Sequence, residues 1–158
     1  RRPPRSTLFP YTTLFRSLYE TDSAERIDLA SYLRDLAGVL LELHERPGIE
    51  VVIEGEGIDL DLGRAIPCAL ACFECVANAL KHGFPEDRSG RVSVRLSAAA
   101  GRAEIEVRDD GVGFPGDFEE RSSGGLGWHL VMNLAAQLGG TAVRLEGPGA
   151  VVRISFPL

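Results

Sequence analysis

Several residue types that mark particular classes of protein are scarce in this sequence of 158 residues. Only three cysteines are present, Cys68, Cys72 and Cys75, and no cysteine or histidine elsewhere completes a metal-binding spacing. We therefore expect buried free thiols, which suit a reducing, cytoplasmic compartment. No apolar run approaches the ~20 residues that a membrane helix needs, so we expect no membrane contact by this domain.

The first 17 residues lack the marks of an evolved segment. They match, residue for residue, the in-frame translation of a common short-read sequencing adapter. A basic targeting segment and a disordered arm are the alternatives, but the segment has no long apolar core and its Arg-Pro opening is unlike a signal peptide. We therefore expect residues 1–17 to be non-native and residues 18–158 to form one domain.

The charge of the chain changes once that segment is set aside. The whole sequence has 17 basic and 23 acidic residues and a net charge of −6. Four of the arginines and none of the acids lie in residues 1–17, so the remainder has 13 basic and 23 acidic residues and a net charge of −10. An acidic body argues against general binding of nucleic acid or anionic membranes, whereas a metal cation with a nucleotide remains compatible.

The apolar periodicity predicts the order αββαββαββ. Helices are expected over 28–45, 64–82 and 126–138, and strands over 49–54, 58–62, 91–97, 103–108, 141–146 and 151–156. About 141 residues suit one domain with a real core. This order favours an α+β, two-layer sandwich in which about three helices cover one face of a mixed β-sheet.

The second predicted helix carries polar groups on one stripe. At ~100° per residue, Glu74, Asn78, Lys81 and His82 fall within one ~100° arc. A carboxylate, an amide and a cation together suit the binding of metal and phosphate, and Lys81 is the only lysine in the chain. Any amphipathic surface helix has a similar pattern, and that alternative stays open.

A carboxylate and two glycines follow the strand predicted over 103–108. Asp109 comes first in Asp-Asp-Gly-Val-Gly, and Gly111 and Gly113 allow the backbone to approach a flat ligand closely. A carboxylate in this position can accept a hydrogen bond from an exocyclic amine. The alternative is an ordinary Asp-Gly turn after a strand.

Glycines also lead into the third predicted helix, at Gly124, Gly125 and Gly127, with Leu126 between the last two. A glycine-rich helix entry exposes unpaired N–H groups and the positive end of the helix dipole, which suit phosphate oxygens. The spacing fits neither a Walker A motif nor a dinucleotide fingerprint. A flexible glycine linker is the alternative.

Together, these three segments resemble the nucleotide-binding motifs of the histidine kinase, gyrase and Hsp90 ATPase superfamily, which has the Bergerat fold. Residues 74–82 look like its N box, residues 109–113 are similar to its D-x-G-x-G box, and residues 125–127 resemble its second glycine box. Short sequence motifs spread over residues 18–158, nearly the whole chain, resemble those of the catalytic domains of two-component kinases of the HisKA_2 and HWE types. The resemblance implies transfer of the γ-phosphoryl group of ATP to a histidine.

The resemblance also implies roles for single residues. Asn78 is expected to bind the Mg²⁺ that bridges the phosphates, and Glu74 to position the nucleophile or a metal-bound water. Lys81 and His82 are expected to meet phosphate charge. Asp109 is expected to accept a hydrogen bond from the adenine amine.

The glycines have implied roles as well. Gly111 and Gly113 would allow close approach to the base, and the backbone of Gly125, Leu126 and Gly127 would cradle the phosphates.

The sequence departs from the family pattern at three places. Ala150 stands where the family often has a threonine near the adenine. Trp128 and His129 replace a more usual aliphatic pair. Only residues 114–123 separate the glycine boxes, which makes a short ATP lid in which Phe114 and Phe118 either cover the base or pack locally.

The family's phosphoacceptor histidine belongs to a dimerising segment that we expect upstream of residue 18. His44 is unlike an acceptor motif, and His82 and His129 lie in ligand motifs. We therefore expect this polypeptide to bind ATP without phosphorylating itself, with the dimerisation segment and a response regulator as partners, and a monomer is compatible with this. An anti-sigma-factor-type serine kinase and a nucleotide-binding interaction module without turnover are the alternatives.

Overall fold

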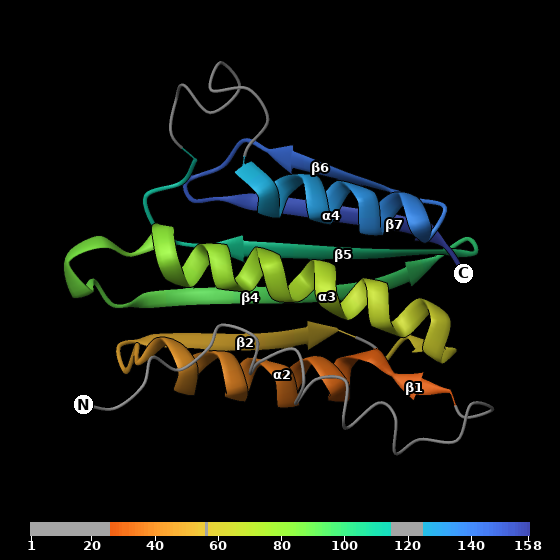
Figure 1. Cartoon of the computed structure of the whole chain (residues 1–158), viewed down its shortest axis with the longest axis horizontal. Helices are drawn as coiled ribbons and strands as arrows, with labels where there is room; N and C mark the ends of the chain where they lie inside the picture. The colour runs from red at the N-terminus through yellow and green to blue at the C-terminus, as the bar shows by residue number, and fades with distance from the viewer. Residues whose placement is uncertain (1–25, 56, 115–124) are drawn as a thin grey trace, which may run out of the picture.

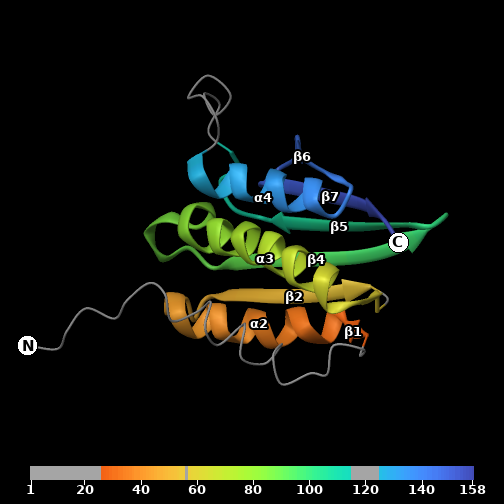
Figure 2. The same ribbon diagram turned by 45° about the vertical axis from the view of Figure 1, so that its right-hand side comes forward.

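The computed structural model describes residues 26–55, 57–114 and 125–158. Helices α2 (Leu29–His44), α3 (Leu62–Asn78) and α4 (Gly125–Gln137) lie side by side over one face of a sheet, with α3 in the middle (Figure 1). Figure 2 shows the same two layers from a second direction. The prediction of an α+β two-layer sandwich with three helices on one face is therefore confirmed. The adapter-like residues 1–17, Phe118 and Gly124 lie outside the described residues.

The main sheet has five strands in the order β2-β4-β5-β7-β6. Their bounds are Ile49–Gly55 for β2, Gly90–Ala99 for β4, Arg102–Asp109 for β5, Thr141–Leu145 for β6 and Val151–Pro157 for β7. β2 and β4 are parallel, and the other neighbours are antiparallel, so the sheet is mixed as predicted. A separate antiparallel pair joins β1 (Ile27–Asp28) to β3 (Asp59–Leu60), which is shorter than the predicted strand.

Local sequence signals explain where α2 and α3 begin. The Asp28 side chain accepts a hydrogen bond from the Ala30 N–H at 3.1 Å, as an N-cap does. Asp61 accepts from the Arg64 N–H at 3.2 Å and starts α3 two residues before the predicted position. Pro67 is the sixth residue of α3, so its missing N–H leaves out one backbone hydrogen bond near the start of the helix.

The prediction of one α-helix through His82 is wrong at its end. α3 stops at Asn78 and continues as a π-helix, η1, over Ala79–Gly83, followed by a 3₁₀ turn, η2, over Pro85–Asp87. A π-helix has more residues per turn than an α-helix, so side chains after Asn78 do not keep the 100° spacing that the sequence argument assumed.

By length and composition, the helical stretch Leu62–Gly83 could cross a membrane, with a mean hydropathy of 1.2. The stretch is not one uninterrupted apolar run, because it contains Arg64, Glu74 and Lys81. However, 61% of its most apolar 18-residue segment is buried inside the protein, and α3 packs on the sheet between α2 and α4 (Figure 1). Its apolar character is that of a core helix.

The sheet face opposite the helices carries alternating charges. Salt bridges between described residues on this face include Arg91–Glu50 at 2.9 Å, Arg95–Glu54 at 3.3 Å, Arg108–Glu106 at 3.2 Å, Arg153–Glu106 at 3.0 Å and Arg153–Glu104 at 3.3 Å. Glu106 meets two guanidinium groups, and the hydrogen bond from Arg153, with that from Arg108, holds the pKa of its carboxyl below the ordinary value of 4.5.

Glu106→Gln should lower the free energy of unfolding by about 0.5 kcal/mol at pH 7, because both arginines are partly exposed and screened. Since the folded pKa is lowered, this stabilisation is present above the unfolded pKa and is lost as the pH falls through the folded value. Urea unfolding of both proteins from pH 7 to pH 3 measures the difference, and Glu50→Gln, at an exposed pair, is the control. An unchanged difference at pH 3 would contradict the ionic origin.

Candidate functional site

A cavity of about 440 Å³ lies between the sheet, α3 and the first turns of α4. Six of the ten residues that were given roles in the predicted site line it: Asn78, His82, Asp109, Gly113, Gly125 and Gly127. The other four do not line it: Glu74, Lys81, Gly111 and Leu126. The volume lies in the range of cavities that hold small molecules and cofactors.

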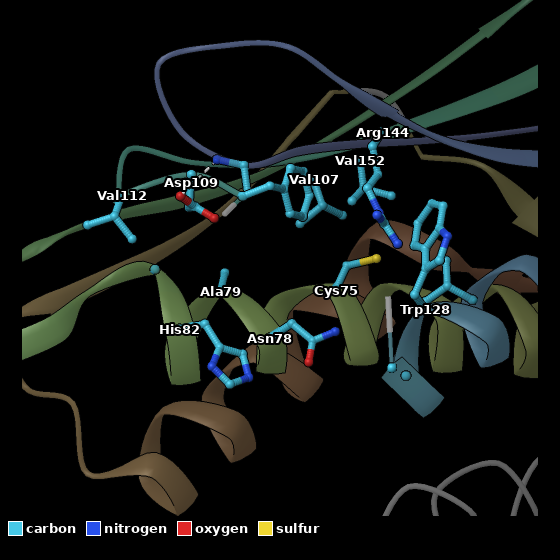
Figure 3. Close-up of a pocket in the computed structure, with 17 residues that line it drawn as sticks. Cys75, Asn78, Ala79, His82, Val107, Asp109, Val112, Trp128, Arg144 and Val152 are labelled. Atoms are coloured by element: carbon cyan, nitrogen blue, oxygen red, sulfur yellow. Dashed lines mark hydrogen bonds between the residues drawn. The ribbon is translucent and has the colours of Figure 1, made fainter. Parts of the chain in front are cut away.

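Asp109 is the one buried charged residue in the described part of the chain, with 3% of its surface exposed. Its Oδ1 accepts hydrogen bonds from the Gly111 N–H at 2.9 Å and the Ala150 N–H at 3.2 Å. Burial raises the pKa of the Asp109 carboxyl, and these two backbone bonds oppose the rise. The carboxylate is therefore fixed by one oxygen at the wall of the cavity (Figure 3).

Two glycines make room for the backbone around Asp109. A Cβ on Gly111 would collide with the Gly83 carbonyl, and one on Gly149 would collide with the Asp109 carbonyl. The Val112 N–H donates to the Gly83 carbonyl at 2.9 Å, so the turn after β5 is pinned to the end of η1. Gly111 thus serves this close packing from outside the cavity, whereas Gly113 lines it with a left-handed φ of 76°.

The start of α4 approaches the polar side chains of α3 through Gly127. A Cβ on Gly127 would lie 3.3 Å from Oε2 of Glu74 and 3.4 Å from Nδ2 of Asn78. The glycine therefore brings the helix entry onto this carboxylate and amide. The first turn of α4 has no acidic residue, so no carboxylate of that turn competes with an anion for the positive end of the helix dipole.

The π-helix separates the two basic residues that the sequence places on one stripe. Both side chains are exposed, but His82 lines the cavity beside Asn78 (Figure 3) and Lys81 does not line it. The predicted common face of all four polar residues is therefore wrong, because the wider turns of η1 change the direction of the side chains. The pKa of His44 is lowered by burial and, to a smaller extent, by the positive charge of Lys81.

Leu126 is 89% exposed, so a contact with phosphates would come from its backbone, as the sequence argument supposed. The predicted buried thiols are confirmed, and burial raises the pKa of Cys75, which lines the cavity.

The sequence argument missed Arg144, whose guanidinium carbon lies 4.1 Å from the centre of the Trp128 ring. Val143 is 44% exposed, so Arg144, the next residue of β6, lies on the inner face of the sheet. The sequence pattern indicates the opposite, because Val143 is the apolar residue of the two.

The donor set fits a nucleotide with a hard cation. A carboxylate lies at one end of the cavity, and Asn78 with the entry of α4 lies beside apolar walls such as Val107 and Val152. Within the described ranges, no cluster of three or more histidine, cysteine or acidic residues could hold a metal ion alone. Glu74 and Asn78 offer two oxygen ligands, and Mg²⁺ is commonly held by one or two such groups together with phosphates.

Comparison with known proteins agrees with this geometry. The family model described as "Histidine kinase-, DNA gyrase B-, and HSP90-like ATPase" matches residues 63–158. The histidine kinase domain from the Erythrobacter litoralis EL346 blue-light activated histidine kinase superposes with a TM-score of 0.84 and 28% identity, covering 98% of this chain and 76% of that one.

Two curated relatives extend the comparison. Blue-light-activated histidine kinase 2 of Erythrobacter litoralis (strain HTCC2594) is 33% identical over 134 residues, which are 84% of this chain and 39% of that protein. Serine-protein kinase RsbW of Bacillus subtilis (strain 168) is 32% identical over 81 residues, which are 41% of this chain and 49% of that protein. This chain thus spans less than half the length of either relative. Because the family model covers well over half of the sequence, the chain belongs to the family of histidine kinase-, DNA gyrase B- and HSP90-like ATPases.

Proposed function

We propose that residues 18–158 are the catalytic domain of a two-component sensor histidine kinase, which transfers the γ-phosphoryl group of ATP to a histidine of a dimerisation segment. A response regulator would then take the phosphoryl group, and the domain would act in the cytoplasm. The proposal rests on one observation: the Asp109 carboxylate, the Asn78 amide and the first residues of α4 line the same cavity. The relative that matches 84% of the chain is a histidine kinase.

Each part of the cavity would have one task in this reaction. Asp109 would accept a hydrogen bond from the adenine amine, and Gly113 would let the base approach. Asn78 and Glu74 would hold Mg²⁺, which supplies positive charge to the phosphates when bound. Positioning and electrostatic stabilisation would provide most of the catalysis, as in other phosphoryl transfers.

The basic residues and the helix entry would act on the phosphates. The N–H groups of Gly125 and Gly127 would face phosphate oxygens at the positive end of α4. His82 lines the cavity and would meet phosphate charge directly. Lys81 would contribute at longer range, since it is exposed outside the lining.

Mg-ATP should raise the melting temperature of the chain. At about 100 times the dissociation constant, a ligand adds roughly 2.7 kcal/mol of stability, which corresponds to about 5–10 °C for a domain of this size. Differential scanning fluorimetry with Mg-ATP, Mg-GTP and Mg²⁺ alone measures the shift, and the adenine nucleotide should give the largest one. An unchanged melting temperature at millimolar Mg-ATP would contradict a nucleotide site.

Transfer to a partner separates the candidate functions. With γ-labelled ATP, a histidine-kinase dimerisation segment supplied in trans should gain an acid-labile, base-stable label, weakly because no tether raises the effective concentration. The similarity to RsbW makes an anti-sigma-type serine kinase the second candidate, and it predicts label on a serine of an anti-sigma antagonist instead. Binding of ATP without either transfer would favour an interaction module without turnover.

A further inference from the structure

Arg144 faces the helices from the inner side of the edge strand β6. Its neighbour Val143 is 44% exposed on the other side of the sheet, and Arg144 is itself half-buried and pairs in register with the buried Val152. Arginine is seldom placed on the core side of a sheet without a specific partner. We therefore expect Arg144 to have specific partners in the cavity.

The guanidinium group of Arg144 lies near two aromatic rings. Its central carbon lies 4.1 Å from the centre of the Trp128 ring and 5.5 Å from the centre of the Phe114 ring, both within the ~6 Å range of cation–π attraction. Trp128 directly follows Gly127, and Phe114 directly follows Gly113. One side chain of β6 thus holds an aromatic residue from each of the two glycine segments, and all three side chains line the cavity.

We propose that Trp128 forms a wall of the base pocket, and that Arg144 is a positioning residue that holds the indole in place. The inference rests on the proposed nucleotide site and adds a residue pair that sets affinity for its base. Figure 3 shows Asp109 and Trp128 on opposite sides of the cavity, with Val107, Val152 and Cys75 between them. A flat purine with its amine at Asp109 meets apolar surface over its faces and the indole at its far side.

Ligands with and without phosphates distinguish this role from direct phosphate binding by Arg144. The guanidinium lies against the indole, which is the contact expected of a residue that positions the ring. A wall residue affects every ligand that carries the base, with or without phosphates. A phosphate ligand affects only the charged nucleotides.

Adenosine and Mg-ATP titrations of Arg144→Met and Arg144→Lys test the assignment. Arg144→Met keeps much of the side-chain length and removes the cation, and it should weaken both ligands by the same factor, about three- to tenfold. Arg144→Lys keeps a cation over the ring and should recover most of the affinity. Arg95→Met, which removes an arginine that is 67% exposed on the opposite sheet face, should change neither affinity.

Trp128 is the only tryptophan in the sequence, so intrinsic fluorescence reports on the wall itself. In the unchanged chain, saturating adenosine should alter the indole emission, and Arg144→Met should shift the emission of the free protein, whereas Arg144→Lys should not. If Arg144→Met does not fold, two adenosine titrations still test the role of Trp128. The indole emission of the unchanged chain must change on binding adenosine, and Trp128→Phe must bind adenosine more weakly than the unchanged chain.

The outcomes test the proposed role of Trp128 and Arg144 separately from the proposed nucleotide site. A loss of Mg-ATP affinity with unchanged adenosine affinity would make Arg144 a phosphate ligand and overturn the proposal. Adenosine binding without any change in indole emission would remove Trp128 from the base pocket. Failure of the unchanged chain to bind either ligand would instead refute the proposed nucleotide site.

Discussion

Asp109→Asn should weaken ATP binding by about 10- to 100-fold and leave the stability of the free protein nearly unchanged. Oδ1 of Asp109 accepts from the Gly111 and Ala150 N–H groups, and the oxygen of an asparagine can keep both bonds. The new NH₂ group then takes the place of Oδ2 and faces the adenine amine as donor against donor. A buried mismatch of this kind costs about 1–3 kcal/mol, and each 1.4 kcal/mol is a tenfold change in affinity.

Isothermal titration calorimetry with ATP and with inosine triphosphate measures this change in base recognition. The inosine base carries an acceptor where adenine has its amine, so the variant should lose its preference for ATP. Asp110→Asn is the matched control, because Asp110 is exposed and accepts from the Arg91 N–H at 2.8 Å, a bond that asparagine retains. Unchanged affinities for both nucleotides in Asp109→Asn would show that Asp109 does not contact the base.

The pH dependence of binding gives an independent measurement on the same residue. Burial raises the pKa of Asp109, so its acceptor is protonated at a higher pH than that of an exposed aspartate. ATP affinity of the unchanged chain should therefore fall as the pH drops toward that raised value. Asp109→Asn, which has no titrating group there, should lose this part of the pH dependence.

The fold was predictable from the sequence because its signals are local. Asp28 is an N-cap as expected, and the strands on both sides of the Ala100–Gly101 turn alternate buried and exposed residues. The placement of Asp109 followed from the same logic, since a carboxylate at the end of a strand before two glycines can be fixed at a sheet edge by backbone N–H groups alone.

The parts that escaped prediction depend on non-local packing. The π-helix at Ala79–Gly83 ends where the Val112 N–H meets the Gly83 carbonyl, and that contact joins segments about thirty residues apart. The position of Lys81 outside the cavity follows from this turn. Arg144 was missed because a single arginine in a short strand looks like a surface residue until Trp128 and Phe114 are placed beside it.

Asn78 should decide the Mg²⁺ dependence of the site. The Asn78 side chain makes no capping hydrogen bond at the junction of α3 and η1, and it lines the cavity beside Gly127. Asn78→Ala and Asn78→Asp should therefore fold, and both should reduce phosphoryl transfer by about 100-fold or more, since loss of even an outer-shell metal partner costs 10- to 100-fold.

The two variants should differ in their response to Mg²⁺. Alanine removes an oxygen ligand, so ATP affinity should become nearly independent of Mg²⁺ while metal-free ATP binds as before. Aspartate adds a negative charge beside the triphosphate, so metal-free ATP should bind more weakly and Mg²⁺ should recover part of the loss. ATP titrations across a series of Mg²⁺ concentrations measure both effects, and Asn133→Ala, at an exposed position of α4, is the control. If the Mg²⁺ dependence survives intact in both Asn78 variants, the metal is held elsewhere, and Glu74, which lies against the same face of Gly127, becomes the residue to test.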